Sequence, residues 1–192
     1  MKYNIPPGEH EILPNLLGLT DPEEAWEAEF EGFLSAQIEL AEGLTATTVF
    51  NAAYIKHIHF SALKHLYEFA GKYRNVNLSK GGFAFPAARF LDASMGAFDK
   101  ETLTRMPHKY LSGESLIRDV AIVHAELLFI HPFREGNGRT ARTLANLMVI
   151  KQGHNPLNFK GIDFELYIKA VQMAAGKEYR LMEDLMKTIC LF

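Results

Sequence analysis

The chain has 192 residues, a length that fits one domain and allows a substantial buried core. Hydrophobic residues make up 48% and charged residues 22%, a balance that excludes a disordered or fibrous protein. The formal net charge of -3 provides no overall positive field, so nucleic acid is not an expected partner. We therefore expect a single domain over residues 1–192, in which residues 1–20 form an amino-terminal extension.

The sequence shows no feature of an exported or membrane protein. The single cysteine, Cys190, cannot form an internal disulfide, and the opening MKYNIPPGEHEIL lacks the apolar run of a secretory signal. The most apolar stretch, VAIVHAELLFI, is too short to cross a bilayer and contains His124 and Glu126. These observations predict a cytoplasmic protein without a membrane partner.

Two long helical patterns come first. Asp21 is a predicted cap, Pro22 suits a first turn, and Gly43 suits a helix stop. Within this segment the apolar residues recur at helical spacing, which predicts that they form the buried side: Trp26, Phe30, Phe33, Leu34, Ile38 and Ala41. A second helix of similar length is predicted over residues 47–71. Its His57 and His59 are two apart and point to different faces, so these residues and His65 do not indicate a metal cluster.

Residues 73–86 have a different pattern. Val76 and Leu78 alternate with polar residues, Phe83 and Phe85 do the same, and a Gly-Gly pair separates the two runs. This arrangement predicts a β-hairpin that leans on helices and presents an open edge.

The rest of the chain is predicted to be helical. Weakly bounded helical patterns follow over residues 86–98 and up to Pro107, and a strongly periodic helix is predicted over residues 113–130. Helices are also expected over residues 139–153 and 163–191, the latter interrupted near Gly176. The sequence therefore predicts an all-α domain with one small hairpin.

The segment from Phe129 to Arg142, FIHPFREGNGRTAR, suggests chemistry. The Gly-Asn-Gly of residues 136–138 opens a helix, where free amides and a flexible turn form an anion site suited to phosphate. Arg139 and Arg142 then share one face of the first turn, where uncompensated cations cost about 0.3 to 1 kcal/mol each. A bound polyphosphate would compensate them; the alternative is a tight interhelical turn whose arginines pair with acids.

His131 and Glu135 supply the other reactive groups of this segment. His131 precedes Pro132 and therefore leaves the helix, and an imidazole can take a proton from a hydroxyl near neutral pH. Glu135 is the only carboxylate inside the loop, and magnesium on phosphates is commonly held by one carboxylate and water. The alternatives are a packed core histidine and a solvated loop charge.

The string HPFREGNGRTAR resembles the signature of the Fic family, HPFx(D/E)GNGRxxR, at every specified position. The stretch IHFSALKHLYEFAGKYRNVNLSKGGF resembles the helix and target-docking flap that precede the Fic core, so the likeness covers about residues 20–190. Fic proteins are helical enzymes that mostly transfer AMP from ATP to a protein hydroxyl. The resemblance implies an all-α Fic-type helical bundle with a small β-hairpin flap and a protein adenylyltransferase that uses ATP and Mg²⁺.

The resemblance also implies roles for single residues. His131 would be the general base, Glu135 the magnesium ligand, and Arg142 the clamp on the terminal phosphate. Phe133 would anchor the loop in the core. The remaining nucleotide contacts implied are the phosphate cradle Gly136, Asn137, Gly138 and Arg139, and at the flap Lys80 and Gly81. An exposed strand edge at the flap would also pair with an extended segment of the target protein.

Two other functions remain open at the level of sequence. One is transfer of a different phosphate-containing group, although Gly138 favours AMP because kinase-like relatives carry a bulkier residue there. The other is a silent nucleotide-binding interaction module, which intact His131 and Glu135 argue against. Many Fic proteins also carry an inhibitory (S/T)xxxE(G/N) helix. Here Leu40 follows Glu39 in the nearest match, so the resemblance implies a separate inhibitory antitoxin that supplies a glutamate to Arg142.

Overall fold

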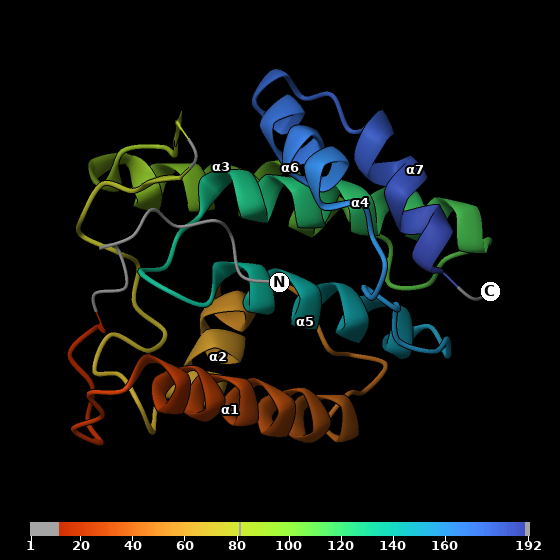
Figure 1. Ribbon diagram of the computed structural model, residues 1–192. Helices are drawn as coiled ribbons and strands as arrows, with labels where there is room; N and C mark the ends of the chain where they lie inside the picture. Colours follow the sequence, from red (N-terminus) through yellow and green to blue (C-terminus); the bar gives the residue numbers. More distant parts are fainter. Residues whose placement is uncertain (1–11, 81, 191–192) are drawn as a thin grey trace.

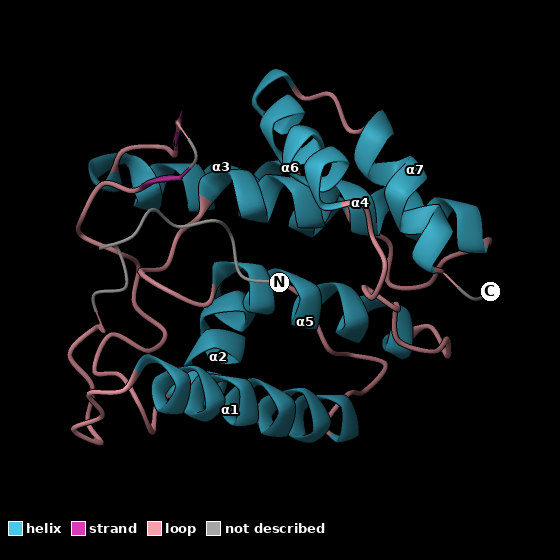
Figure 2. Cartoon of the chain, in the orientation of Figure 1, coloured by secondary structure: helices cyan, strands magenta, loops and turns pink. Residues whose placement is uncertain are grey.

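Helices dominate the part of the chain that the computed structural model describes, residues 12–80 and 82–190 (Figure 2). The α-helices are α1 (Pro22–Glu42), α2 (Ala52–Leu63), α3 (Leu91–Glu101), α4 (Gly113–Ile130), α5 (Asn137–Lys151), α6 (Phe164–Met173) and α7 (Arg180–Ile189). Single 3₁₀ turns are η1 (Ala88–Phe90), η2 (Leu103–Arg105) and η3 (Ala174–Gly176), and the strands are β1 (Ser79–Lys80) and β2 (Phe83–Ala84). The predicted all-α architecture with one hairpin is confirmed.

The helix α5 is the centre of the bundle. In Figure 1 it lies between α1 and α4, and it contacts α1, α2 and α4, while α6 and α7 pack on α4. Its buried side chains include Leu144, Leu147 and Val149, all without exposed area. Because α5 contains the second half of the FIHPFREGNGRTAR segment, the core directly fixes that segment. Among the described residues, none of the helices has the length and apolar character needed to span a membrane.

The helix α4 follows the sequence closely. It spans Gly113–Ile130, the range predicted from its periodicity, and Ser112 caps its start by accepting a hydrogen bond from the Ser115 amide at 3.2 Å. Leu116, Val120 and Leu127 of its stripe are at most 1% exposed. The helix ends at His131, which takes a left-handed conformation with φ 51°.

The start and end of α1 are as predicted, but the predicted buried side is wrong. Asp21 accepts hydrogen bonds from the Glu23 and Glu24 amides, and Gly43 ends the helix. The side of α1 that faces the core is rotated from the predicted side by about one residue. It consists of Ala25, Glu29, Phe33, Ala36 and Leu40. Of the predicted positions, Phe33 is buried and Ala41 is partly buried, whereas Trp26, Phe30, Leu34 and Ile38 form an exposed stripe.

Two further helical boundaries differ from the predictions. The helix α2 ends at Leu63 and not near Gly71, because residues 64–71 form tight turns with i→i−3 hydrogen bonds, such as that from the Leu66 amide to the Leu63 carbonyl. After Pro86 the helix α3 is delayed to Leu91 by η1. The hairpin pairs Ser79 with Ala84 and Lys80 with Phe83, so each strand has only two residues.

Two phenylalanines on α1 test the corrected face. Phe33 is 6% exposed and Phe30 is 50% exposed, although they lie one turn apart. We expect Phe33→Ala to lower the free energy of unfolding by about 3 to 5 kcal/mol, because it opens a cavity in the core. The matched Phe30→Ala should lower it by about 0.5 kcal/mol or less. Urea denaturation of both variants decides this, and a larger loss for Phe30→Ala would contradict the observed face.

Candidate active site

The loop between α4 and α5 is closed by one asparagine. The Asn137 side chain accepts a hydrogen bond from the Phe133 amide at 2.8 Å and donates one to the Phe133 carbonyl at 2.7 Å. Phe133 has no exposed area and its ring stacks on His59 with centroids 3.9 Å apart, so the predicted core anchor is confirmed. These contacts fix both ends of the turn from Phe133 to Asn137.

His59 supports the same loop from α2. Its Nε2 donates to the Glu135 carbonyl at 3.0 Å, and its Nδ1 accepts from the Gly71 amide at 2.8 Å. Both bonds need a neutral ring with its proton on Nε2. Burial lowers the pKa of His59 to about 4, which keeps the ring neutral at pH 7. This supporting role of His59 was not predicted from the sequence, where the residue was considered only as a metal ligand.

Gly136 is required by both conformation and packing. Its φ is +75°, and an added Cβ would lie 3.0 Å from the Phe33 ring and 3.2 Å from a Leu63 methyl group. A side chain here would be strained and would also collide with α1 and α2. The glycine therefore lets α5 begin directly against the core.

The predicted phosphate cradle lies at the amino terminus of α5. The first helical hydrogen bond runs from the Thr140 amide to the Gly136 carbonyl at 2.8 Å, so the amides of residues 137–139 precede the helical ladder. The structure thus gathers Gly136, Asn137, Gly138 and Arg139 in one turn. The Asn137 side chain, however, is 4% exposed and committed to Phe133, which leaves its backbone amide for an anion.

His131 is fixed as a neutral base. Its Nδ1 lies 3.1 Å from the Leu128 carbonyl, which can only accept, so Nδ1 carries the proton and Nε2 keeps its lone pair. The ring stacks on Phe85 of the hairpin with centroids 3.9 Å apart. Burial is the main cause that lowers the pKa of His131 to about 4, and the cations of Lys80 and Arg74 add to it.

Arg139 is held by a carboxylate that the sequence analysis missed. Its Nη2 donates to Glu29 Oε2 at 2.5 Å and to Glu135 Oε1 at 3.2 Å, and Glu29 Oε1 accepts from the Tyr67 hydroxyl at 2.6 Å. Glu29 is 8% exposed, and its place on the Ala25 and Phe33 side of α1 was the available signal. The alternative in which a motif arginine pairs with an acid therefore holds for Arg139.

Arg142 differs from Arg139. Within the described ranges, residues 12–80 and 82–190, no ion pair or side-chain hydrogen bond involves Arg142. A Cβ placed on Gly138 would lie 3.5 Å from Arg142 Nη1, so the guanidinium covers the face of the first turn at that glycine. Arg142 thus offers an uncompensated charge beside the free amides of α5.

Glu135 is the candidate magnesium ligand. Its side chain is 46% exposed, and its Oε1 accepts from the Gly136 amide at 2.9 Å. Among the residues the structure describes, no cluster of three or more His, Cys, Asp or Glu side chains is suited to a metal. An accessible lone carboxylate fits Mg²⁺, which keeps several waters and takes other oxygens from nucleotide phosphates.

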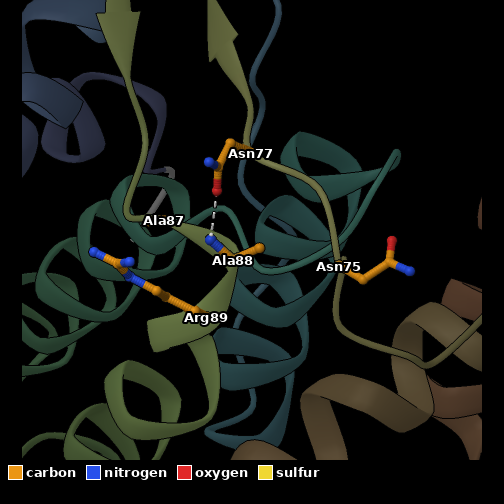
Figure 3. A pocket seen from close by; sticks show the side chains of 5 residues that line it. All are labelled: Asn75, Asn77, Ala87, Ala88 and Arg89. Atoms are coloured by element: carbon orange, nitrogen blue, oxygen red, sulfur yellow. Dashed lines mark hydrogen bonds between the residues drawn. The ribbon is translucent and has the colours of Figure 1, made fainter.

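The flap lies beside His131 and borders a pocket. Burial lowers the pKa of Lys80 to about 8, and the charge of the Glu135 carboxylate opposes this shift, so Lys80 is close enough to the loop to interact with it electrostatically. Gly81 lies outside the described residues. The pocket, of about 370 Å³, is lined by Asn75, Asn77, Ala87, Ala88 and Arg89 (Figure 3). Asn77 accepts from the Ala88 amide at 2.9 Å, which joins the two arms of the flap.

His124 is a packed residue. It is 1% exposed, its Nδ1 lies 3.1 Å from the Ala141 carbonyl, and its Nε2 lies 2.6 Å from the Tyr167 hydroxyl. Since the carbonyl only accepts, Nδ1 donates and Nε2 accepts from Tyr167. Burial lowers the pKa of His124 to about 3. The residue ties α4 to α5 and α6 and has no role in the loop.

Comparisons with known proteins agree on one family. The Fic/DOC family profile matches residues 49–149. A protein adenylyltransferase Fic of Nematostella vectensis is 30% identical over 147 residues, which are 76% of this chain and 32% of that protein. Its counterpart in Aedes aegypti is 29% identical over 132 residues, 66% of this chain and 25% of that protein. The chain thus spans a third or less of these curated relatives.

Solved structures share the fold. The N-terminal Fic domain of a VirB-translocated effector from Bartonella sp. AR 15-3 has a TM-score of 0.79 at 20% identity, over 96% of this chain and 89% of that chain. The BepC protein of Bartonella tribocorum, solved with bound AMPPNP, has a TM-score of 0.75 at 22% identity, over 93% and 92% of the two chains. The bundle with its flap is therefore a Fic-type fold.

The buried His59 predicts a specific pH dependence of stability. Its pKa is about 4 in the folded protein and 6.5 for a solvated histidine, so between these pH values the unfolded chain binds the extra proton. Stability should fall as pH drops through that window, and His59 should contribute about 2 kcal/mol of the loss between pH 7 and pH 5.

Chemical denaturation of His59→Gln at both pH values checks this expectation. Between pH 7 and pH 5 the free energy of unfolding should fall less in this variant than in wild type, whatever the absolute stability of the variant. His57 is exposed on the same helix and provides the control. In His57→Gln the free energy of unfolding should fall between pH 7 and pH 5 as much as in wild type. An unchanged difference in His59→Gln would show that this ring is not held neutral.

Proposed function

The chain belongs to the Fic/DOC family, and from this premise we propose that it is a protein adenylyltransferase, which transfers AMP from ATP to a Tyr, Thr or Ser hydroxyl of a target protein. The observation that carries the proposal is His131: a neutral imidazole with its proton fixed on Nδ1 and Nε2 available, in the loop that leads into a free helix amino terminus. A base and an anion site in one loop suit attack of a hydroxyl on a phosphate.

The proposed reaction moves one proton and exchanges one phosphorus–oxygen bond. His131 Nε2 takes the proton of the target hydroxyl, and the hydroxyl oxygen attacks the α-phosphorus of ATP. The bond from that phosphorus to the oxygen bridging the β-phosphate breaks, and pyrophosphate leaves. The lowered pKa of His131 keeps the base unprotonated before attack.

The anion site stabilises the charge that develops on the phosphates. The amides of residues 137–139 and the Arg142 guanidinium are aligned by α5 before the nucleotide binds, so little reorganisation is needed. Arg139, already paired with Glu29, contributes less net charge than Arg142. A magnesium ion held by Glu135 would neutralise phosphate charge and orient the leaving group.

The target protein is proposed to dock on the flap. The hairpin has only two strands among the described residues, and an extended segment can add to such an edge by main-chain hydrogen bonds. Phe85 of the flap touches the His131 ring, so a docked segment lies close to the base. A cytoplasmic site of action fits ATP as the donor.

Two competing functions are disfavoured by particular contacts. Against transfer of another phosphate-containing group, Gly138 stands where kinase-like relatives carry a bulkier residue, beside Arg142. For a silent binding module, the fixed tautomer and the strained φ of His131 would have no use.

An inhibitory antitoxin that acts on Arg142 remains part of the proposal. Glu39 is exposed on α1 and, within the described part of the chain, forms no ion pair with Arg142. A separate protein that delivers a glutamate to this arginine would oppose productive ATP binding.

Labelled ATP tests the reaction. Purified protein incubated with whole-cell lysate should transfer label from α-labelled ATP and none from γ-labelled ATP. His131→Ala should lower transfer by about 100-fold or more, because it removes the general base, while ATP affinity stays within about twofold. The exposed His57→Ala serves as control and should keep wild-type transfer. Transfer of the γ label would contradict adenylyl transfer and would indicate phosphoryl transfer.

Arg142 can be tested by nucleotide length. If its charge meets the terminal phosphate, Arg142→Ala should weaken ATP binding by about tenfold, or 1.4 kcal/mol, and weaken ADP binding much less. Isothermal titration calorimetry measures both affinities, with Arg118→Ala on the exposed side of α4 as control. Equal losses of affinity for ATP and ADP would contradict a contact between Arg142 and the terminal phosphate.

A further inference from the structure

Arg74 is a buried arginine that holds the two arms of the flap. It is 4% exposed, its Nη1 donates to the Val76 carbonyl at 2.7 Å, and its Nη2 donates to the Pro86 carbonyl at 2.6 Å. Val76 and Pro86 lie on opposite arms, just below the hydrogen bond from the Phe85 amide to the Leu78 carbonyl. One planar guanidinium therefore sets the separation of the arms at the base of the flap.

The same residue also holds the backbone of the proposed base. Arg74 Nε donates to the His131 carbonyl at 2.8 Å, and the Arg74 amide donates to the Pro132 carbonyl at 2.8 Å. The peptide groups that follow His131 and Pro132 are thus both fixed by Arg74. This matters because His131 has φ 51°, a conformation that a residue with a side chain keeps only when its surroundings impose it.

The charge of Arg74 has an unusual environment. Within residues 12–80 and 82–190 no carboxylate forms an ion pair with it, so the buried cation is stabilised by backbone carbonyl dipoles. A buried guanidinium without a carboxylate is costly, and three directed carbonyls compensate it only when they remain in place together. Movement of any one carbonyl weakens the site for the others.

The flap reaches His131 by a second route. The Phe85 ring stacks on the imidazole at a centroid distance of 3.9 Å and an interplanar angle of 15°, and it also contacts Phe83 on the flap. Phe85 directly precedes Pro86, whose carbonyl Arg74 holds. The imidazole is therefore placed by Phe85 from one side, while its own backbone is placed by Arg74.

We propose that Arg74 is a positioning residue that couples the flap, where the target docks, to the orientation of His131. When the arms of the flap are correctly spaced, the hydroxyl of a docked target segment lies beside His131 Nε2. This inference rests on the proposed function, because it assumes that His131 is the base and that the flap binds the target. Arg74 acts on the proposed site through the His131 and Pro132 carbonyls.

Arg74→Lys is the decisive variant. Lysine keeps the charge but is a point donor on a flexible chain, and it cannot span three carbonyls arranged around a planar fork. We expect kcat of automodification with α-labelled ATP to fall by about tenfold or more, because a small misplacement of the base is costly to transfer. Affinity for a non-hydrolysable ATP analogue should stay within about twofold, since the cradle on α5 is untouched.

A double-mutant cycle separates positioning from simple loss of stability. Phe85→Leu removes the ring contact and leaves Arg74 in place. The fold-loss in kcat of the double variant should be smaller than the product of the two single fold-losses, because both residues act on one imidazole. Lys177→Met is the control, because it removes a partner of the buried Glu126 away from the flap. It should lower the melting temperature and leave kcat within about twofold.

Hydrogen exchange of the nucleotide-free protein gives a readout that does not require AMP transfer. In Arg74→Lys the amides of residues 76–86 and 131–137 should both exchange faster, and in Lys177→Met neither segment should change. Faster exchange confined to residues 76–86, with unchanged kcat, would reduce Arg74 to a local support of the flap and overturn the coupling. If Arg74→Lys does not fold, unchanged kcat in Phe85→Leu overturns it equally.

The two proposals can fail separately. If wild type transfers no AMP to any protein, the proposed function fails, and the exchange experiment still decides whether Arg74 joins the two segments. If wild type transfers AMP and Arg74→Lys matches it in kcat, the coupling fails and the adenylyltransferase assignment is unaffected.

Discussion

The pair of hydrogen bonds between Asn137 and the backbone of Phe133 is the constraint on which the site depends. It closes the loop on itself, and the Phe133 ring then enters the core against His59. From the opposite side, Gly136 brings the first turn of α5 against Phe33 and Leu63, where an added Cβ would crowd both side chains. The loop is thus part of the hydrophobic core, which gives its amides and its histidine a defined position without a ligand.

Charge is distributed unequally over this rigid frame. Arg139 is neutralised by the buried Glu29, which Tyr67 also holds, whereas Arg142 keeps its charge for the face beside Gly138. One motif arginine therefore joins α5 to α1 and the other is left for an anion. The histidines follow the same division: His59 supports the loop and His131 keeps an available Nε2.

Local sequence patterns predicted the ends of helices better than the face that a helix buries, since the apolar spacing of α1 indicated the wrong side. Cap residues and a regular stripe defined the ends of α1 and the whole of α4, and the motif placed the loop. What failed depended on distant partners. The buried Glu29 is satisfied by Tyr67 and Arg139, which lie 38 and 110 residues away, and no local pattern names these partners. Likewise α2 ends early because turns after Leu63 bring Tyr67 to Glu29 and Gly71 to His59, which overrides helix propensity.

The most direct test of this account is the tautomer of His131 in the protein without nucleotide. Long-range proton–nitrogen correlation spectra of protein labelled in its histidines, assigned by comparison with His131→Ala, report which ring nitrogen carries the proton. With Nδ1 bonded to the Leu128 carbonyl and the pKa lowered to about 4, His131 should remain neutral and protonated on Nδ1 from pH 7 down to about pH 5. A proton on Nε2, or a titration near pH 6.5, would contradict the claim that the fold prepares this histidine as a base.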